Sequence, residues 1–300
     1  MVSTPVRTVR SLLLTSGASR RPPVARIGSG NHDKMKRHFE KMHGLGNDFV
    51  IIDARTDPVR MTAERARAIA HRRTGIGCDQ LIVLEPSTSA EIKMRIWNCD
   101  GGEVESCGNA TRCVAKLTGA KRIETPGGLL EAEFVADEIE ARIPPPRFAW
   151  HEIPLAYPSD TDALPMGWES LERPMALNVG NPHLVFFVDD LGSVALDRLG
   201  PMIENDPVFP QRINVNVAMI VGTSVELRTW ERGSGLTLAC GTGACATAVA
   251  ALKTRRASSP LEVVMPGGSL MVSWAEGESI RMRGRATHVF GGEFDVEAIE

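Results

Sequence analysis

The stretch Leu238-Ala239-Cys240-Gly241-Thr242-Gly243-Ala244-Cys245-Ala246-Thr247-Ala248 decides how the rest of the sequence is interpreted. It predicts a strand that ends in a glycine turn and then opens a helix of small residues. Cys240 would lie at the N-terminus of this helix, where the helix dipole favours a thiolate. The glycines leave backbone N–H groups uncovered, so that a carboxylate can bind beside the sulfur. The alternative is a buried structural cysteine in a tight turn.

A second stretch, Cys107-Gly108-Asn109-Ala110-Thr111-Arg112-Cys113-Val114-Ala115, repeats this pattern 133 residues earlier (240 − 107 = 133). Further landmarks recur in the same order at nearly the same separation, which indicates an internal duplication. They are Arg95 and Trp97 with Arg228 and Trp230 (133), Gly46-Asn47 with Gly180-Asn181 (134), and Pro126-Gly127-Gly128 with Pro266-Gly267-Gly268 (140).

The duplication predicts an α+β fold of two homologous domains related by a pseudo-twofold axis. In each domain a sheet would wrap around a central helix of small residues, and the active site would lie in the cleft between the domains. Cys107 and Cys240 would then face one site from opposite sides. Inversion of a stereocentre needs one group on each face of a carbon atom, and two thiols so placed can remove and return an α-proton.

Composition shifts set the predicted domain boundaries. Residues 1–36 form an extension that carries five arginines and no acidic residue before Asp33, which is typical of a targeting segment or of translation from an upstream start codon. We favour the second explanation and expect poor order there. The first domain would cover residues 37–150 and the second 151–300, with the last strand, about 285–300, packing on the first domain.

Apolar runs and capping signals predict the elements of each half. The expected strands are 39–42, 49–52, 79–84, 92–97, 129–135 and 138–143 in the first half, and 175–179, 184–188 and 225–230 in the second, where Asn214 opens a further strand in the place that Gln80 holds in the first half. Helices are expected from the N-cap Thr62 to about 72, and over 197–204.

Composition excludes several classes of function. The chain of 300 residues has 34 basic and 37 acidic residues, so its net charge of −3 gives no basis for nucleic-acid binding. No apolar run approaches the ~20 residues that span a membrane. The six cysteines include no Cys-x2-Cys pair, which argues against structural zinc, and they do not form a disulfide framework. We therefore expect a cytoplasmic protein without a metal, and we interpret Cys78, Cys99, Cys113 and Cys245 as structural.

Six ordered motifs make the sequence from Met42 onward resemble the diaminopimelate epimerase family. They are M-H-G-L-G-N-D-F at 42–49, G-I-G-C-D-Q at 75–80, N-C-D-G-G-E-V-E-S-C-G-N at 98–109, G-N-P-H at 180–183, W-E-R-G-S-G at 230–235 and A-C-G-T-G-A at 239–244. The resemblance implies a cofactor-independent enzyme that interconverts LL- and meso-2,6-diaminopimelate and is usually a homodimer.

The resemblance also implies roles for individual residues. Cys107 and Cys240 would be the two acid/base thiols, supported by His183 and Glu231. The substrate would be bound by Asn47, Gln80, Asn98, Gly108, Asn109, Asn181, Asn214, Glu231, Arg232, Gly241 and Thr242. Because the helix N-termini should lower both thiol pKa values while the pair shares one proton, we expect a bell-shaped pH–rate profile.

Other interpretations stay open at this point. Asn47, Asn98 and Asn181 are also typical turn residues, Arg232 is also typical of a surface ion pair, and His183 is also typical of a buried structural histidine. The sequence departs from the family pattern at Leu236, which replaces a glutamate close to Arg232. A related two-cysteine racemase of the proline or hydroxyproline type, a thiol–disulfide oxidoreductase and an inactive binding scaffold are the alternatives.

Overall fold

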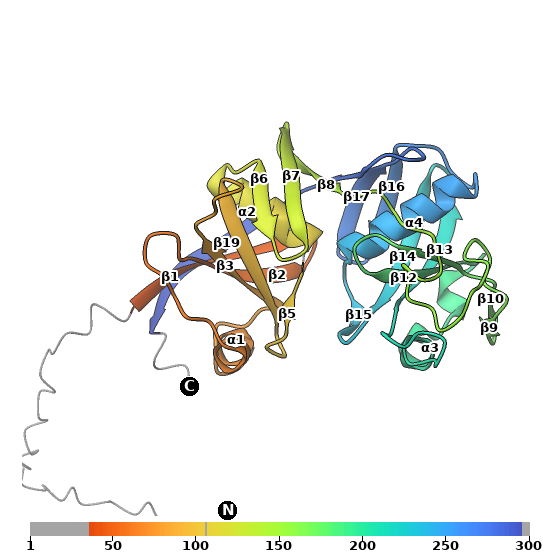
Figure 1. The fold of residues 1–300 in the computed structure, drawn as a ribbon, viewed down its shortest axis with the longest axis horizontal. Helices are drawn as coiled ribbons and strands as arrows, with labels where there is room; N and C mark the ends of the chain where they lie inside the picture. The colour runs from red at the N-terminus through yellow and green to blue at the C-terminus, as the bar shows by residue number, and fades with distance from the viewer. Residues whose placement is uncertain (1–35, 106, 296–300) are drawn as a thin grey trace, which may run out of the picture. The chain divides into compact units, whose positions relative to one another are not determined.

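The computed structural model describes residues 36–105 and 107–295, which belong to one compact unit (Figure 1). The predicted N-terminal extension lies outside the described residues except for Lys36, which begins the first strand. The first repeat consists of β1 (Lys36–Gly44), β2 (Asn47–Asp53), α1 (Ala63–Ala70), β3 (Gln80–Glu85), β4 (Ile92–Asn98), β5 (Glu103–Val104), α2 (Gly108–Thr118), β6 (Arg122–Thr125), β7 (Gly128–Val135) and β8 (Glu138–Ile143).

The second repeat has the same order of elements. It consists of β11 (Met175–Asn178), β12 (Pro182–Phe187), α3 (Leu196–Glu204), β13 (Asn214–Val221), β14 (Ser224–Glu231), β15 (Gly235–Thr237), α4 (Gly241–Lys253), β16 (Leu261–Met265), β17 (Gly268–Ser273) and β18 (Ile280–Gly284). The hairpin of β9 (Gly167–Trp168) and β10 (Leu171–Glu172) precedes it, the 3-10 helix η2 (Leu191–Ser193) precedes α3, and β19 (Thr287–Asp295) follows it.

Strand pairing confirms the duplication. In both repeats the first two strands are antiparallel, the second and third are parallel, and the third and fourth are antiparallel. The fourth strand then pairs in parallel with the strand after the central helix, and two antiparallel pairs complete each sheet. Even the register is shared, since Phe49 pairs with Gln80 and His183 pairs with Asn214, each partner lying 134 residues from its equivalent (183 − 49 and 214 − 80).

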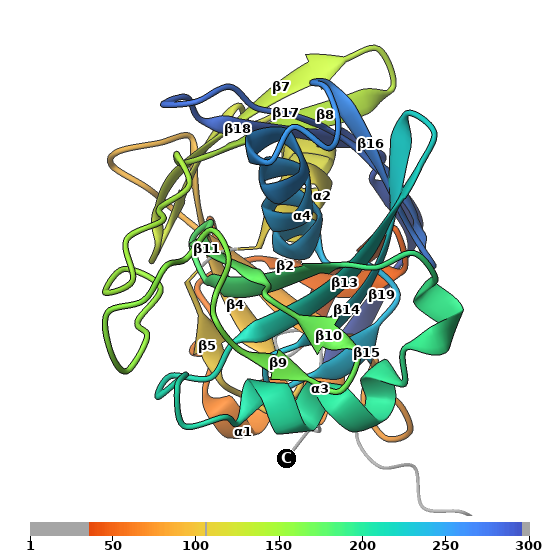
Figure 2. The same ribbon diagram turned by 90° about the vertical axis from the view of Figure 1, so that its right-hand side faces the viewer.

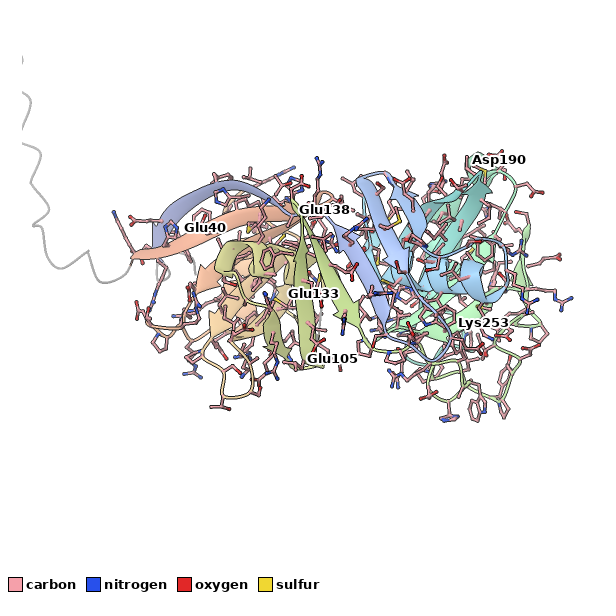
Figure 3. The ribbon with its side chains drawn as sticks, turned by 90° about the horizontal axis from the view of Figure 1, so that it is seen from above. Glu40, Glu105, Glu133, Glu138, Asp190 and Lys253 are labelled. Carbon is pink, nitrogen blue, oxygen red and sulfur yellow. The ribbon has the colours of Figure 1, made fainter. Side chains whose placement is uncertain are left out.

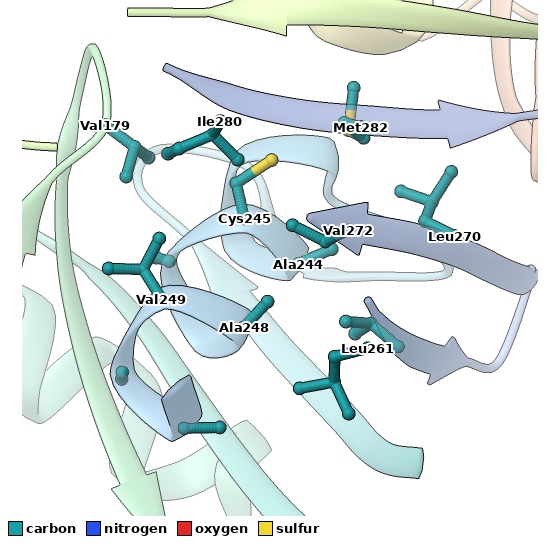
Figure 4. Close-up of a cluster of buried hydrophobic side chains, with 14 of the residues drawn as sticks. Val179, Ala244, Cys245, Ala248, Val249, Leu261, Leu270, Val272, Ile280 and Met282 are labelled. Atoms are coloured by element: carbon teal, nitrogen blue, oxygen red, sulfur yellow. The ribbon is translucent and has the colours of Figure 1, made fainter. Parts of the chain in front are cut away.

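The central helices α2 and α4 are enclosed by the strands of their own repeats, as Figure 2 shows for α4. A helix in this position is buried on nearly every side, so only small side chains fit between it and the sheet. Ala244, Ala248 and Cys245 have no exposed surface, and they pack against Leu261, Val272 and Ile280 of the surrounding strands (Figure 4).

Strands β8 and β18 join the repeats into one sheet. They are antiparallel with Ala141 opposite Met282, two residues that are 141 apart, and Ile143 opposite Ile280. Residues 141 apart occupy equivalent positions in the two strands, and Ile139 and Ile280 are another such pair. The β8–β18 pairing is therefore symmetric about the Ala141–Met282 pair. An ion pair of 3.3 Å between Glu138 and Arg283 also connects these two strands. Glu138, the first residue of β8, is labelled in Figure 3. The C-terminal strand β19 returns to the first repeat and pairs with β1.

The predicted elements are largely present, and some differ in length: β1 is nine residues long where 39–42 was expected. Thr62 caps α1 as expected and accepts a bond from the Arg65 N–H at 3.3 Å. The helix ends at Ala70 instead of about 72, because His71 adopts an extended conformation. Among the described residues, no helix is both long and apolar enough to cross a membrane.

Candidate active site

Cys107 and Cys240 are the N-cap residues of the two central helices. Each has an extended backbone, and its sulfur accepts the N–H of the residue three positions on: Ala110 at 3.5 Å from Cys107, and Gly243 at 3.3 Å from Cys240. Both thiols therefore lie where unpaired backbone N–H groups and the positive end of a helix dipole meet.

The surroundings of Cys107 come from the turn after β1 and from α2. The Asn47 Oδ1 atom lies 4.0 Å from the Cys107 sulfur and 3.2 Å from the Asn109 Nδ2 atom, which donates to it. Asn47 donates its own Nδ2 to Asp79 at 3.2 Å, and the Arg112 guanidinium donates to Asn109 Oδ1 at 2.7 Å. Each amide is thus held in one orientation, with the Asn47 oxygen toward the thiol.

The surroundings of Cys240 are a chain of hydrogen bonds. The Thr242 hydroxyl lies 3.5 Å from the sulfur, and the Asn181 Nδ2 atom donates to that hydroxyl at 3.3 Å. The Asn181 Oδ1 atom is 2.9 Å from His183 Nε2, and the other imidazole nitrogen is 3.0 Å from the side chain of Asn216. The chain connects the thiol to the interior of the second repeat.

Glu231 links the two thiols electrostatically. Its carboxylate accepts the Thr237 hydroxyl at 2.5 Å, and its charge acts on both Cys107 and Cys240. Burial raises the pKa of Glu231 above its usual range. The N-termini of α2 and α4 also approach each other, since a Cβ atom built on Gly241 would lie 3.2 Å from Asn109 Oδ1. The two cysteines therefore belong to one neighbourhood.

The expected net lowering of the thiol pKa values is wrong for this structure, because burial outweighs the helix N-termini. Burial is the largest influence on both thiols and raises the pKa of Cys107 to about 11 and that of Cys240 well above its ordinary value. The Glu231 carboxylate raises both pKa values further, and the N–H bonds at the helix N-termini oppose these effects without overcoming them. His183 changes in the opposite sense, because burial and the Arg232 charge lower its pKa to about 3.

The remaining predicted residues form two further pairs. Gln80 donates its Nε2 to Asn98 Oδ1 at 2.9 Å, while Gln80 Oε1 is buried without a hydrogen-bond partner among the described residues. Asn214 accepts the Arg232 backbone N–H at 3.0 Å and donates to Pro182 O at 2.8 Å. The Arg232 guanidinium donates to Gln211 O at 3.0 Å, so a backbone carbonyl holds it while Leu236, where the family has a glutamate, is partly exposed.

Sequence reasoning missed three buried or half-buried contributors. Asp79 orients Asn47, Arg112 orients Asn109, and Asn216 contacts His183. Each carries a signal in the sequence: Asp79 adjoins Gln80, Arg112 interrupts a helix of small residues, and Asn216 follows Asn214 by two positions in an apolar strand, which places both on one face. Among the described residues no three His, Cys, Asp or Glu side chains gather as metal ligands.

Comparison with solved structures identifies the fold. The Bacillus anthracis phenazine biosynthesis protein of the PhzF family matches with a TM-score of 0.61 at 17% identity, covering 86% of this chain and 99% of its own. A hydroxyproline epimerase from Agrobacterium vitis matches with a TM-score of 0.61 at 15% identity, covering 87% of this chain and 93% of its own. The chain therefore has the duplicated α+β fold that these proteins share.

Sequence comparison gives the family. The diaminopimelate epimerase model matches residues 39–145 and 175–289, one segment in each repeat. The diaminopimelate epimerase of Rhizorhabdus wittichii is 60% identical over 267 residues, 88% of this chain and 97% of its own, and that of Sphingopyxis alaskensis is 60% identical over 263 residues, 87% and 98%. The chain belongs to the diaminopimelate epimerase family and is an isomerase.

Proposed function

We propose that this enzyme interconverts LL- and meso-2,6-diaminopimelate with Cys107 and Cys240 as its two acid/base groups. The observation that carries the proposal is the pseudo-symmetric placement of one thiol at the N-cap of each central helix. Family membership supplies the substrate, since the relatives that share 60% of the sequence are diaminopimelate epimerases.

In each direction of the reaction, one cysteine as thiolate takes the α-proton from one face of the carbon. The electron pair of the broken C–H bond is stabilised by electrostatics, because the N–H groups at the starts of α2 and α4 hold the adjacent carboxylate. The other cysteine as thiol gives its proton to the opposite face. One proton leaves, another arrives, and the configuration inverts.

The surroundings of the thiols suggest how one of them becomes a thiolate despite its raised pKa. The Cys240 sulfur lies 3.5 Å from the Thr242 hydroxyl, which can donate a hydrogen bond to it and so favours the thiolate. The Cys107 sulfur instead faces the amide oxygen of Asn47, which can only accept a hydrogen bond and so favours the protonated thiol. These two hydrogen-bonding contacts favour Cys240 as the thiolate, while the Glu231 charge raises the pKa of both thiols.

Unsatisfied polar groups suggest where the rest of the substrate binds. Gln80 Oε1 is a buried acceptor without a partner among the described residues, and an ammonium group of the substrate would satisfy it. The half-buried Arg232 guanidinium would bind the carboxylate at the distal end, beside Asn214. A substrate with an amino and a carboxyl group at each end fits this set better than proline does.

The same proposal places the enzyme in lysine biosynthesis and in the cytoplasm, where Cys107 and Cys240 would stay reduced, and as a homodimer. The competing proline-type racemase needs no distal subsite, and a thiol–disulfide oxidoreductase would turn over with a dithiol. Oxidation of the cysteine pair should instead inactivate an epimerase, because both proton carriers would be lost.

The test follows LL-diaminopimelate in D2O with the reduced enzyme. We expect meso-diaminopimelate that carries deuterium at the inverted carbon, and losses of about 100-fold or more in Cys107→Ala and Cys240→Ala. Cys245→Ala, five residues further along α4, is the matched control and should keep its rate. Exchange with proline or hydroxyproline alone would overturn the substrate, and turnover of a dithiol without any exchange would overturn the reaction.

A further inference from the structure

Asn216 lies in β13 with no exposed surface, and its side chain makes three hydrogen-bonding contacts. Its Nδ2 donates to Leu184 O at 2.8 Å and also faces His183 Nδ1 at 3.0 Å. Its Oδ1 accepts the Thr229 hydroxyl at 3.0 Å. All three partners are buried, so the geometry of this amide is fixed by the fold.

The backbone carbonyl of Leu184 determines which way the Asn216 amide points. A carbonyl can only accept, so the NH2 group of Asn216 must face it. The same NH2 group faces His183 Nδ1, and this nitrogen is therefore an acceptor without a proton. Because His183 is buried and neutral, its single ring proton must lie on Nε2.

The position of the His183 proton then fixes how the Asn181 amide and the Thr242 hydroxyl are oriented toward the Cys240 sulfur. His183 Nε2–H donates to Asn181 Oδ1 at 2.9 Å, which turns the Asn181 NH2 group toward Thr242 Oγ1 at 3.3 Å. Because this NH2 group donates to the Thr242 oxygen, the hydroxyl proton of Thr242 is free to point at the Cys240 sulfur, 3.5 Å away.

We propose that Asn216 is a positioning residue that acts through His183, Asn181 and Thr242 to aim a hydroxyl proton at Cys240 and so stabilise its thiolate. The inference rests on the proposed role of Cys240 as a proton carrier. The Thr242 hydroxyl would counter the Glu231 charge, which disfavours a thiolate at the same sulfur. After the proton has left, the Thr242 hydroxyl remains as a donor to the charged sulfur.

The variant Asn216→Asp reverses the chain without a change in side-chain volume. A carboxylate accepts from His183, so in the neutral ring the proton moves to Nδ1 and Nε2 becomes an acceptor, while Leu184 O loses its donor. The Asn181 amide then turns over, its oxygen takes the Thr242 proton, and Cys240 loses its donor. Asn216→Leu removes the donor to Nδ1 altogether, so the two tautomers should mix.

The first readout is the His183 tautomer by 15N NMR, with the resonances assigned from their absence in His183→Gln. We expect the wild-type proton on Nε2 and the Asn216→Asp proton on Nδ1. Asn178→Asp is the matched control, because Asn178 is also buried and also donates to a backbone carbonyl, that of Glu152, and its side chain has no hydrogen bond to His183 among the described residues. A wild-type proton on Nδ1 would overturn the inference.

The second readout is the rate of iodoacetamide alkylation at Cys240 relative to Cys107, measured by mass spectrometry at one neutral pH. Losing one hydrogen bond to the thiolate should lower this ratio about fivefold in Asn216→Asp. Thr242→Val should show the same loss with the His183 tautomer unchanged, and Thr242→Ser should restore the ratio. An unchanged ratio in Thr242→Val would contradict the proposal.

Neither readout requires turnover, so the proposed function and the hydrogen-bond chain can be refuted independently. An enzyme that does not epimerise diaminopimelate but shows both results would refute the proposed function and retain the hydrogen-bond chain. An active epimerase in which the variants leave the alkylation rate of Cys240 relative to Cys107 unchanged would retain the proposed function and refute the hydrogen-bond chain.

Discussion

Asn47 and Asn181 occupy equivalent positions in the two repeats, 134 residues apart, but turn opposite ends of their amides toward the thiol site. Asn47 donates its nitrogen to Asp79 and presents its oxygen to Cys107. Asn181 places its oxygen on His183 and presents its nitrogen to Thr242, whose hydroxyl lies beside Cys240. The duplicated fold thus gives its two thiols opposite hydrogen-bonding environments, which suits a pair that must differ by one proton.

Asp79→Leu should therefore impair catalysis through Asn47. Without the carboxylate at 3.2 Å, the Asn47 amide is free to turn its nitrogen toward Cys107. We expect kcat to fall about tenfold, the effect of one or two misplaced hydrogen bonds, while KM changes less. The measurement is steady-state epimerisation with a coupled or chiral assay.

The control for this variant is Asp48→Asn. The Asp48 side chain bonds to Lys41 and Arg72 and accepts the Asp79 backbone N–H, and an asparagine keeps an acceptor for that N–H while the Asp79 carboxylate that holds Asn47 stays in place. Both variants should lose stability, and only Asp79→Leu should lose turnover. Equal losses of turnover would mean that the cluster acts by stability alone.

Gly243→Ala should destabilise the second repeat and disturb Cys240. A Cβ atom at this position would lie 2.6 Å from Asn216 Oδ1 and 3.0 Å from Thr229 Oγ1, two buried atoms that are bonded to each other. We expect a loss of about 1–3 kcal/mol in the free energy of unfolding, as is usual for overpacking, measured by urea denaturation. In the control Gly102→Ala the nearest atom is the Asp100 carboxylate at 3.1 Å, which accepts the Gly102 N–H but belongs to an exposed side chain that can shift slightly, so the stability should change little.

Alkylation of Cys107 should become faster as the pH rises. Burial and the Glu231 charge raise its pKa to about 11, so the thiolate fraction at neutral pH is small. Below that pKa, each pH unit should raise the iodoacetamide rate about tenfold. Peptide mapping of Cys107 from pH 7 to 10 in the Cys99→Ser background measures the slope. A rate that levels off near pH 7 would show that the helix N-terminus prevails over burial.

The repeat could be predicted from the sequence because the landmarks that define it are glycines and cysteines with strict local requirements. Gly46 and Gly180 both have positive φ, and Cys107 and Cys240 both cap helices. The same residue types therefore occur at nearly the same separation in the two halves. For the same reason the pairs Phe49–Gln80 and His183–Asn214 keep one register.

The polar chains behind the thiols could not be predicted in this way, because the repeats differ there. Asp79 corresponds to Ile213, and Asn216 corresponds to Ile82, at a separation of 134 in each case. Each half thus anchors its asparagine with a residue that the other half lacks. The direction of the thiol pKa shifts was also predicted wrongly. The sequence indicates that each cysteine begins a helix, but it does not indicate how deeply the thiols are buried.

His183 should make the protein sensitive to mild acid. The native state holds the imidazole neutral, with a pKa of about 3, whereas in the unfolded chain the imidazole binds a proton below about pH 6.5. Between these values the unfolded state binds more protons, so the free energy of unfolding must rise with pH. The stability that His183 contributes is present above about pH 6.5 and is lost progressively as the pH falls toward 3. At pH 5 the loss attributable to this residue is about 2 kcal/mol.

Urea titrations of wild type and His183→Gln from pH 8 to 4.5 measure this loss as the change in the difference between their free energies of unfolding. The carboxylates that both proteins share contribute equally to the two values. The difference should be constant above pH 7 and shrink below it, and a constant difference across the whole range would show that the imidazole binds its proton equally well in the native and unfolded states.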